Sequence, residues 1–92
     1  MNNWFLYVIR CKNGRLYTGI TTNVERRFAE HTSNGKKGAK YLRGKAPLTL
    51  VMKKKIGSRS MALKIEARVK KLPKIKKEMF VVGKIKVKEI WK

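Results

Sequence analysis

Residues 4–20 read WFLYVIRCKNGRLYTGI, and this stretch decides the fold. The aromatic and β-branched side chains of residues 4–9 predict a β-strand. Asn13-Gly14 is a turn signal, and residues 16–20 predict a second strand that returns beside the first. The chain therefore begins with a β-hairpin.

A helix, a loop and a third strand are predicted after the hairpin. Residues 22–25 read Thr-Asn-Val-Glu and match a capping box, which opens a helix that runs to about His31. Residues 33–45 are rich in Gly and Lys and predict a mobile basic loop. Residues 48–52 predict a third strand, entered after Pro47.

The second half of the chain predicts further helices. Ser58 or Ser60 caps a helix that ends near residue 72. One face of this helix is apolar and carries Met61, Ile65, Val69 and Leu72. Pro73 ends this helix or starts a short third one. From Lys84 onward, lysines alternate with Ile85 and Val87, which predicts an edge strand or a disordered arm.

These elements predict an α+β fold, a three-stranded antiparallel sheet flanked by helices. A chain of 92 residues allows one domain. We place this domain at residues 1–80 and expect residues 81–92 to form a basic, flexible C-terminal tail. Cys11 is the only cysteine, so no disulfide can form within the chain, and we expect it to be a small apolar strand residue.

The charge is large and unevenly placed. The chain has 25 Lys and Arg residues and 5 acidic residues, a formal net charge of +20, and 20 of the basic residues follow residue 35. Such a charge repels itself and needs an anionic partner. Nucleic acid is the first candidate, above all DNA, and an anionic membrane surface and a ribosomal role rank below it.

A membrane partner is not expected, because no basic helix has a broad aromatic or leucine face. The sequence has no apolar run near the ~18 residues that span a bilayer, and its N-terminus lacks a signal-peptide pattern. We therefore expect a cytoplasmic protein, and we favour a monomer.

The composition excludes several kinds of enzyme. The chain has no Asp, five scattered Glu residues and a single histidine. A two-metal nuclease needs several carboxylates in one place, a structural zinc site needs four Cys or His ligands, and a Ser-His-Asp triad needs an Asp. No glycine-rich phosphate loop is present either. An enzyme that acts on phosphates must here use few carboxylates and rely on Tyr, Arg or His.

Five side chains are candidates for such a site: Tyr7, Tyr17, Arg27, His31 and Glu66. The two tyrosines lie on predicted strands, where ordinary core packing explains them equally well. Arg27 and His31 lie one helical turn apart on one flank of the first helix's apolar stripe. Glu66 borders the apolar face of the second helix, where a salt bridge to Lys70 is the simpler explanation. None of these signals is specific by itself.

Together these residues resemble a known signature. Residues 6–8 (Leu-Tyr-Val), 17–19 (Tyr-Thr-Gly) and 23–31 (NVERRFAEH), followed by Glu66 on a helix, are similar to the GIY-YIG nuclease family. The resemblance covers about residues 4–80 and is strongest to the small stand-alone bacterial members. Leu-Tyr-Val replaces Gly-Ile-Tyr in the first motif. Many members place an Asn after the metal-binding Glu, and no Asn follows Asn34 here.

The resemblance implies a metal-dependent endonuclease that hydrolyses phosphodiester bonds in DNA, with a structure-specific role in repair or recombination. It implies that Tyr7 is the general base on the attacking water, with Tyr17 beside it. Arg27 would stabilise the phosphate in the transition state, and His31 would assist Tyr7 or contact the phosphate. Glu66 would hold a single Mg²⁺ or Mn²⁺ ion.

A free tyrosine titrates near ~10, which is high for a base at neutral pH. We expect Arg27, a bound cation and the net charge to lower the pKa of Tyr7.

The basic residues of the second half are the candidates for phosphate contacts. Those singled out are Lys36, Lys37, Lys40, Arg43, Lys45, Lys70 and Lys71. The same surface supports an alternative function, a catalytically weak or inactive module that only binds DNA or structured RNA. Phosphate contacts carry no base specificity, so no sequence preference is predicted.

The hairpin decides whether the two tyrosines can share a site. A two-residue loop at Asn13-Gly14 would place Tyr7 and Tyr17 on opposite faces of the sheet, because side chains alternate along a strand. We predict instead a three-residue loop over residues 12–14, with Gly14 at positive φ in a bulge. This loop pairs Ile9 with Tyr17 and places both phenols on one face.

Overall fold

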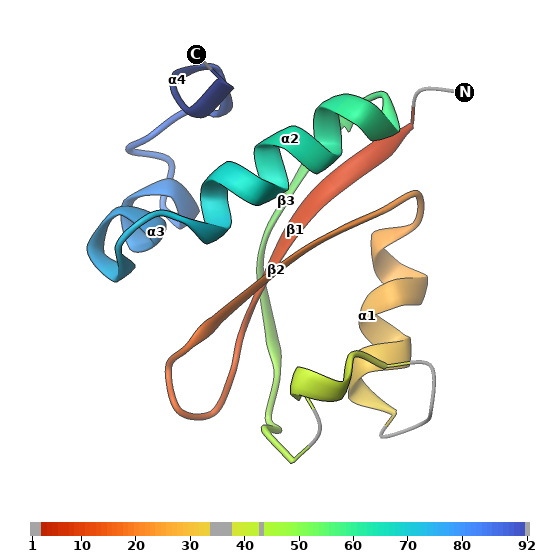
Figure 1. Cartoon of the computed structure of the whole chain (residues 1–92). Helices are drawn as coiled ribbons and strands as arrows, with labels where there is room; N and C mark the ends of the chain where they lie inside the picture. The colour runs from red at the N-terminus through yellow and green to blue at the C-terminus, as the bar shows by residue number, and fades with distance from the viewer. Residues whose placement is uncertain (1–2, 34–37, 43, 92) are drawn as a thin grey trace.

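The computed structural model describes residues 3–33, 38–42 and 44–91 and has the α+β architecture that the sequence predicts (Figure 1). The elements are, in chain order, β1 (Trp4–Arg10), β2 (Leu16–Thr21), α1 (Val24–Thr32), a 3₁₀ helix (Lys40–Leu42), β3 (Thr49–Gly57), α2 (Arg59–Lys70), α3 (Lys74–Val81) and α4 (Val87–Trp91). The three strands form one antiparallel sheet in the order β2-β1-β3, so β1 is the central strand.

The β1–β2 hairpin has the three-residue loop. The register pairs Ile9 with Tyr17 and Tyr7 with Gly19. The backbone N–H of Cys11 donates to the carbonyl of Arg15 at 2.8 Å, and that of Gly14 donates to the carbonyl of Cys11 at 2.9 Å. Gly14 has φ 84°, the left-handed conformation that glycine adopts without steric strain. The predicted loop and the shared face of the two tyrosines are therefore confirmed.

The central strand separates two clusters of buried side chains. Leu6 faces α2 and packs with Ile65 and Val69 of that helix. Tyr7, Ile9 and Cys11 face the other way and pack with Val24 of α1 and Leu42 of the 3₁₀ helix. Figure 1 shows α2 crossing the sheet, with α1 away from it on the far side. All the apolar side chains of β1 from Leu6 to Ile9 are buried, because both faces of this strand are covered.

Two local predictions need correction. Helix α1 begins one residue later than the capping box suggests, because the side chain of Asn23, not Thr22, accepts the N–H of Arg26 at 3.0 Å. Glu25 closes no capping box and instead lies 2.6 Å from Nζ of Lys53.

Strand β3 is longer than predicted and includes residues 53–55, which are three lysines. It is an edge strand, so these polar side chains stay in solvent while the backbone pairs with β1.

Helix α2 begins at the predicted cap, since Ser58 accepts the N–H of Met61 at 3.2 Å. Ile65 and Val69 are buried as expected, whereas Met61 at the start of the helix is 37% exposed.

The C-terminal segment is neither an edge strand nor an arm. Residues 87–91 form α4, and Ile90 is buried against α2 and Phe80 of α3. The guanidinium of Arg68 on α2 donates to the carbonyl of Ile90 at 3.0 Å, which ties the two helices together. The predicted flexible tail over residues 81–92 is therefore wrong for the part of it that the structure describes, which folds onto the domain.

Ile90→Ala tests this packing, and Ile75→Ala is its matched control. Ile90 is 9% exposed and Ile75 is 71% exposed. Loss of a buried isoleucine side chain should reduce the free energy of unfolding by about 2 kcal/mol or more, and the exposed position should change it by less than about 0.5 kcal/mol. Urea denaturation measures both. Equal effects would mean that α4 does not pack on the core.

Candidate active site

The phenol of Tyr7 lies at the centre of the site. The side chain is 2% exposed and its ring crosses the backbone of Gly19 on the paired strand β2. A Cβ atom at position 19 would lie 2.5 Å from Oη of Tyr7, closer than unbonded atoms approach. Glycine is therefore required at position 19 to make room for the phenol.

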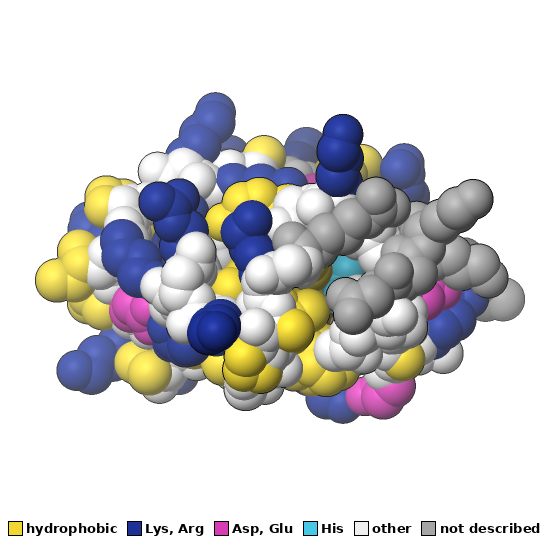
Figure 2. All heavy atoms as spheres, turned by 90° about the horizontal axis from the view of Figure 1, so that it is seen from below, with side chains coloured by type: hydrophobic (Ala, Val, Ile, Leu, Met, Phe, Trp, Pro, Cys, Tyr) yellow, Lys and Arg dark blue, Asp and Glu magenta, His cyan; other side chains and the backbone are white. Residues whose placement is uncertain are grey.

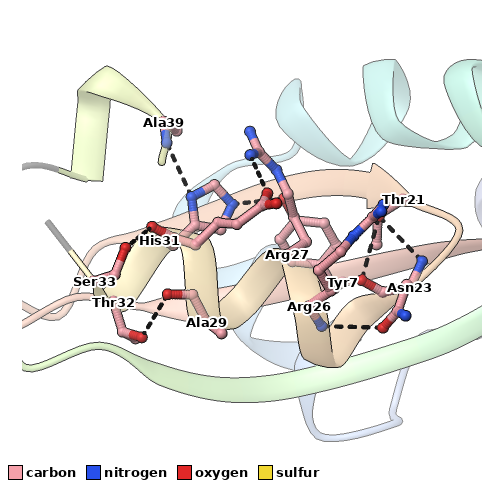
Figure 3. Close-up of polar contacts among 11 residues, drawn as sticks. Tyr7, Thr21, Asn23, Arg26, Arg27, Ala29, His31, Thr32, Ser33 and Ala39 are labelled. Atoms are coloured by element: carbon pink, nitrogen blue, oxygen red, sulfur yellow. Dashed lines mark hydrogen bonds and ion pairs between the residues drawn. The ribbon is translucent and has the colours of Figure 1, made fainter. Parts of the chain in front are cut away.

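His31 is held between Tyr7 and the backbone of Ala39 (Figure 3). The N–H of Ala39 donates to Nδ1 of His31 at 3.0 Å, so Nδ1 carries no proton. The proton of the neutral ring is then on Nε2, which donates to Oη of Tyr7 at 2.9 Å. Burial, together with the charge of Arg27, lowers the pKa of His31 and keeps the ring neutral. His31 therefore supplies a hydrogen-bond donor to the phenol and cannot accept the phenol's proton.

Tyr17 completes a cluster of rings on this face of the sheet. Its ring centroid lies 6.4 Å from that of Tyr7 and 5.5 Å from that of His31. The structure thus brings together the two tyrosines and the histidine that the sequence singled out.

Burial dominates the ionisation of Tyr7. Desolvation, with a smaller contribution from Tyr17, raises its pKa from 10.0 to about 12. Arg27 acts in the opposite direction, through a hydrogen bond and its charge, but does not outweigh burial. We expected Arg27 and the net charge to lower this pKa; in the protein without a bound cation the balance is the reverse.

Arg27 is half-buried and shared between two partners. Its Nη1 lies 2.9 Å from Oε1 of Glu30, and the guanidinium also interacts with the phenol of Tyr7. Burial works to lower the pKa of Arg27, but the bonds to Glu30 and Tyr7 outweigh it and raise the pKa. The guanidinium is therefore charged and fixed beside the phenol, where a phosphate oxygen would find a planar pair of donors.

Glu66 lies on α2, near enough to Tyr7 for its charge to act on the phenol. Its side chain is 18% exposed, and its negative charge contributes to the raised pKa of Tyr7. Oε2 of Glu66 lies 3.3 Å from Nζ of Lys70 on the next turn, so the simpler explanation, a salt bridge within the helix, is also correct. Among the described residues, no three His, Cys, Asp or Glu side chains gather as metal ligands.

The basic residues predicted to contact phosphates are only partly gathered at this site. Lys45 lies over the ring of Tyr41, next to Tyr17, and Lys70 is beside Glu66. Lys40 is exposed on the 3₁₀ helix, whereas Lys71 lines a separate groove near α4. Lys36, Lys37 and Arg43 lie outside the described residues. Figure 2 shows Lys and Arg side chains over much of one face, with few acidic ones.

Tyr41 belongs to the ring cluster but was not among the sequence candidates. Its ring stacks on that of Tyr17 with centroids 5.9 Å apart and planes 21° apart. A lone aromatic in a Gly- and Lys-rich loop gives no periodic signal, so only the fold places it at the site. The predicted mobile loop is locally ordered here, because Leu42 of the same 3₁₀ helix is buried in the core.

Comparison with known proteins agrees with this geometry. The pattern of the GIY-YIG catalytic domain matches residues 3–78. A UPF0213 protein of Cronobacter sakazakii is 58% identical over 85 residues, which cover 92% of this chain and 87% of that protein. The UPF0213 protein YhbQ of Escherichia coli K12 is 57% identical over 81 residues, which cover 88% of this chain and 79% of YhbQ.

A solved structure gives the same picture. The solution NMR structure of a UPF0213 protein from Bacillus halodurans matches 98% of this chain and 93% of that one, with a TM-score of 0.58 and 42% identity.

No helix in the described part of this chain is long and apolar enough to cross a bilayer.

NMR can test the state of His31 directly, since it is the only histidine. We expect the Nε2–H tautomer and a titration midpoint below the ordinary 6.5, because burial and Arg27 disfavour the charged ring. The contribution of neutral His31 to the free energy of unfolding should be fully present above pH 6.5. It should be lost as the pH falls below 6.5 through the lowered pKa of the folded protein. An Nδ1–H tautomer, or a midpoint at or above 6.5, would contradict the assignment.

Proposed function

Because the chain belongs to the GIY-YIG catalytic domain family, we propose that it is a metal-dependent endonuclease that hydrolyses phosphodiester bonds in DNA. The observation that carries the proposal is the hydrogen bond of His31 to a buried phenol on which the charge of Arg27 also acts. His31 hydrogen-bonds the phenol of Tyr7 at 2.9 Å, and the charge of Arg27 acts on the same phenol and lowers its pKa against the effect of burial. A hydrogen-bond donor and a cation at one buried phenol both favour its ionised form, and positive charge from a bound metal ion would add to their effect.

Each residue then has a defined task. Tyr7, as phenolate, takes a proton from the attacking water, while His31 steadies the negative oxygen through its Nε2–H. Arg27 donates hydrogen bonds to the phosphate oxygens and stabilises the negative charge that grows there. Tyr17 packs against Tyr7 and His31 and shields the phenol from bulk water.

Glu66 is the residue we assign to hold one Mg²⁺ or Mn²⁺ ion. A single carboxylate suits Mg²⁺, which keeps several waters and takes substrate phosphate oxygens as further ligands. When bound, the ion would supply positive charge beside the phosphate and the phenol. Lys70 is mostly exposed, so its ammonium is free to turn from Glu66 toward the DNA backbone.

A second candidate, a module that binds DNA or structured RNA without cutting it, is favoured by one observation. Burial raises the pKa of Tyr7 to about 12, so the phenol keeps its proton at neutral pH. Unless bound metal supplies enough positive charge, the site would be inactive and the basic surface would remain a binding surface.

Metal-dependent nicking distinguishes the two candidates. We expect cleavage in Mg²⁺ or Mn²⁺ on at least one of duplex, single-stranded, flap and four-way DNA, the branched forms representing repair and recombination substrates. Glu66→Gln should abolish cleavage, and Tyr7→Phe should slow it by about 10²-fold or more. Glu25→Gln removes the same charge from a surface side chain that is 72% exposed and should leave the rate unchanged.

The affinity of these variants for DNA should stay within about twofold of the parent protein. A wild-type protein that cuts no substrate with either metal would overturn the nuclease proposal and leave the binding module.

Salt dependence tests the nucleic-acid surface without reference to cleavage. If six or more phosphates are neutralised, affinity should fall by roughly three orders of magnitude between about 50 and 200 mM salt. Fluorescence anisotropy with a labelled oligonucleotide measures this fall. A flat response would indicate that the net charge of +20 is not used to bind a phosphate backbone.

A further inference from the structure

A basic groove opens beside the ring cluster, between the β1–β2 turn and α3. It has a volume of about 760 Å³, in the range of pockets that bind small ligands. Its lining includes four cationic side chains, those of Arg10, Arg15, Lys74 and Lys77. Tyr41 also lines the groove. The groove therefore has cationic side chains along its lining and reaches the aromatic cluster of the site at Tyr41.

The one carboxylate in the groove does not cancel this charge. Glu78 receives a bidentate contact from Arg10, at 2.6 and 2.7 Å, and lies 3.0 Å from Nζ of Lys74. These partners lower its pKa to about 2, so it is always ionised and is balanced by them. Arg15 and Lys77 add two further positive charges to the lining. The groove is thus suited to an anionic chain such as a phosphate backbone.

Tyr41 offers the groove an exposed aromatic ring at a fixed position. The side chain is 42% exposed, while the neighbouring Leu42 is 2% exposed and anchors the 3₁₀ helix in the core. The ring stacks on Tyr17, whose own ring lies 6.4 Å from that of Tyr7. A nucleobase stacked on Tyr41 would therefore be separated from Tyr7, the residue that we assign as the general base, by the ring of Tyr17.

We propose that this groove binds an unpaired nucleotide of the DNA substrate, with its base stacked on Tyr41 and its phosphates near Arg15 and Lys77. Exposed aromatic rings in basic grooves are what recognise unpaired bases, whose faces are open. In a duplex those faces are covered by neighbouring base pairs. This inference rests on the proposed nuclease function and extends it, to substrates with a single-stranded segment beside the cleaved bond.

Lys45 must move for the base to bind. Its ammonium lies 4.4 Å from the centroid of the Tyr41 ring. Stacking of a base on tyrosine is stronger than an exposed contact between a lysine and a ring, so the exchange is favourable.

The test measures binding in EDTA, where no cleavage is needed. One probe is a duplex with a single-stranded extension, and the other is a blunt duplex with the same number of phosphates. Tyr41→Ala should weaken binding to the first about tenfold and leave the second unchanged, whereas Tyr41→Phe should bind both like the parent protein. The fluorescence of 2-aminopurine in the extension should be quenched by the parent protein and by Tyr41→Phe, but not by Tyr41→Ala.

Equal weakening on both probes, or no weakening on either, would overturn the proposal. If Tyr41→Ala does not fold, Tyr41→Leu makes the same comparison, because it keeps apolar bulk without an aromatic face. A protein that never cuts DNA can still pass this test, and an active nuclease can fail it. The failure of this inference is thus distinct from failure of the proposed function.

Discussion

The hydrogen bond from Nε2 of His31 to Oη of Tyr7, at 2.9 Å, joins three segments of the chain. Tyr7 belongs to the central strand, His31 to α1, and the N–H that fixes the imidazole belongs to Ala39. Gly38 allows this approach, since a Cβ there would lie 2.8 Å from the carbonyl oxygen of Glu30. The position and protonation of the phenol therefore depend on β1, on α1 and on the segment around Ala39 together.

Burial and charge oppose each other at this phenol. Removal of Tyr7 from water disfavours the phenolate, and the guanidinium of Arg27 recovers only part of that loss. The net charge of +20 is spread over a surface where solvent and salt screen it, so it has little effect on the pKa of the buried Tyr7. Positive charge that arrives next to the phenol acts at short range in a poorly hydrated site and has a larger effect. On this account Tyr7 ionises only when a cation is bound beside it.

The sheet and the ring cluster were predictable from the sequence because strand parity is rigid. Once Ile9 pairs with Tyr17, the two phenols must share a face. The length of β3 was not predictable, because three consecutive lysines give no apolar pattern on an edge strand. Helix α4 has five residues, too few for a helical period, and tertiary contacts such as those of Ile90 with the core and with Arg68 hold it in place. Tyr41 was missed for a related reason, since its partner Tyr17 is distant in sequence.

The assignment of Tyr7 as the base of a one-ion nuclease is tested most directly by diffraction. Crystals of the protein bound to uncleavable phosphorothioate DNA would be soaked in Mn²⁺, and the anomalous signal would locate the metal. The expected result is one ion on a carboxylate oxygen of Glu66, Lys70 turned away from it, and Oη of Tyr7 within hydrogen-bond distance of a water placed to attack the scissile phosphorus. Two ions, an ion away from Glu66, or a phosphate held only by lysines far from Tyr7 would contradict it.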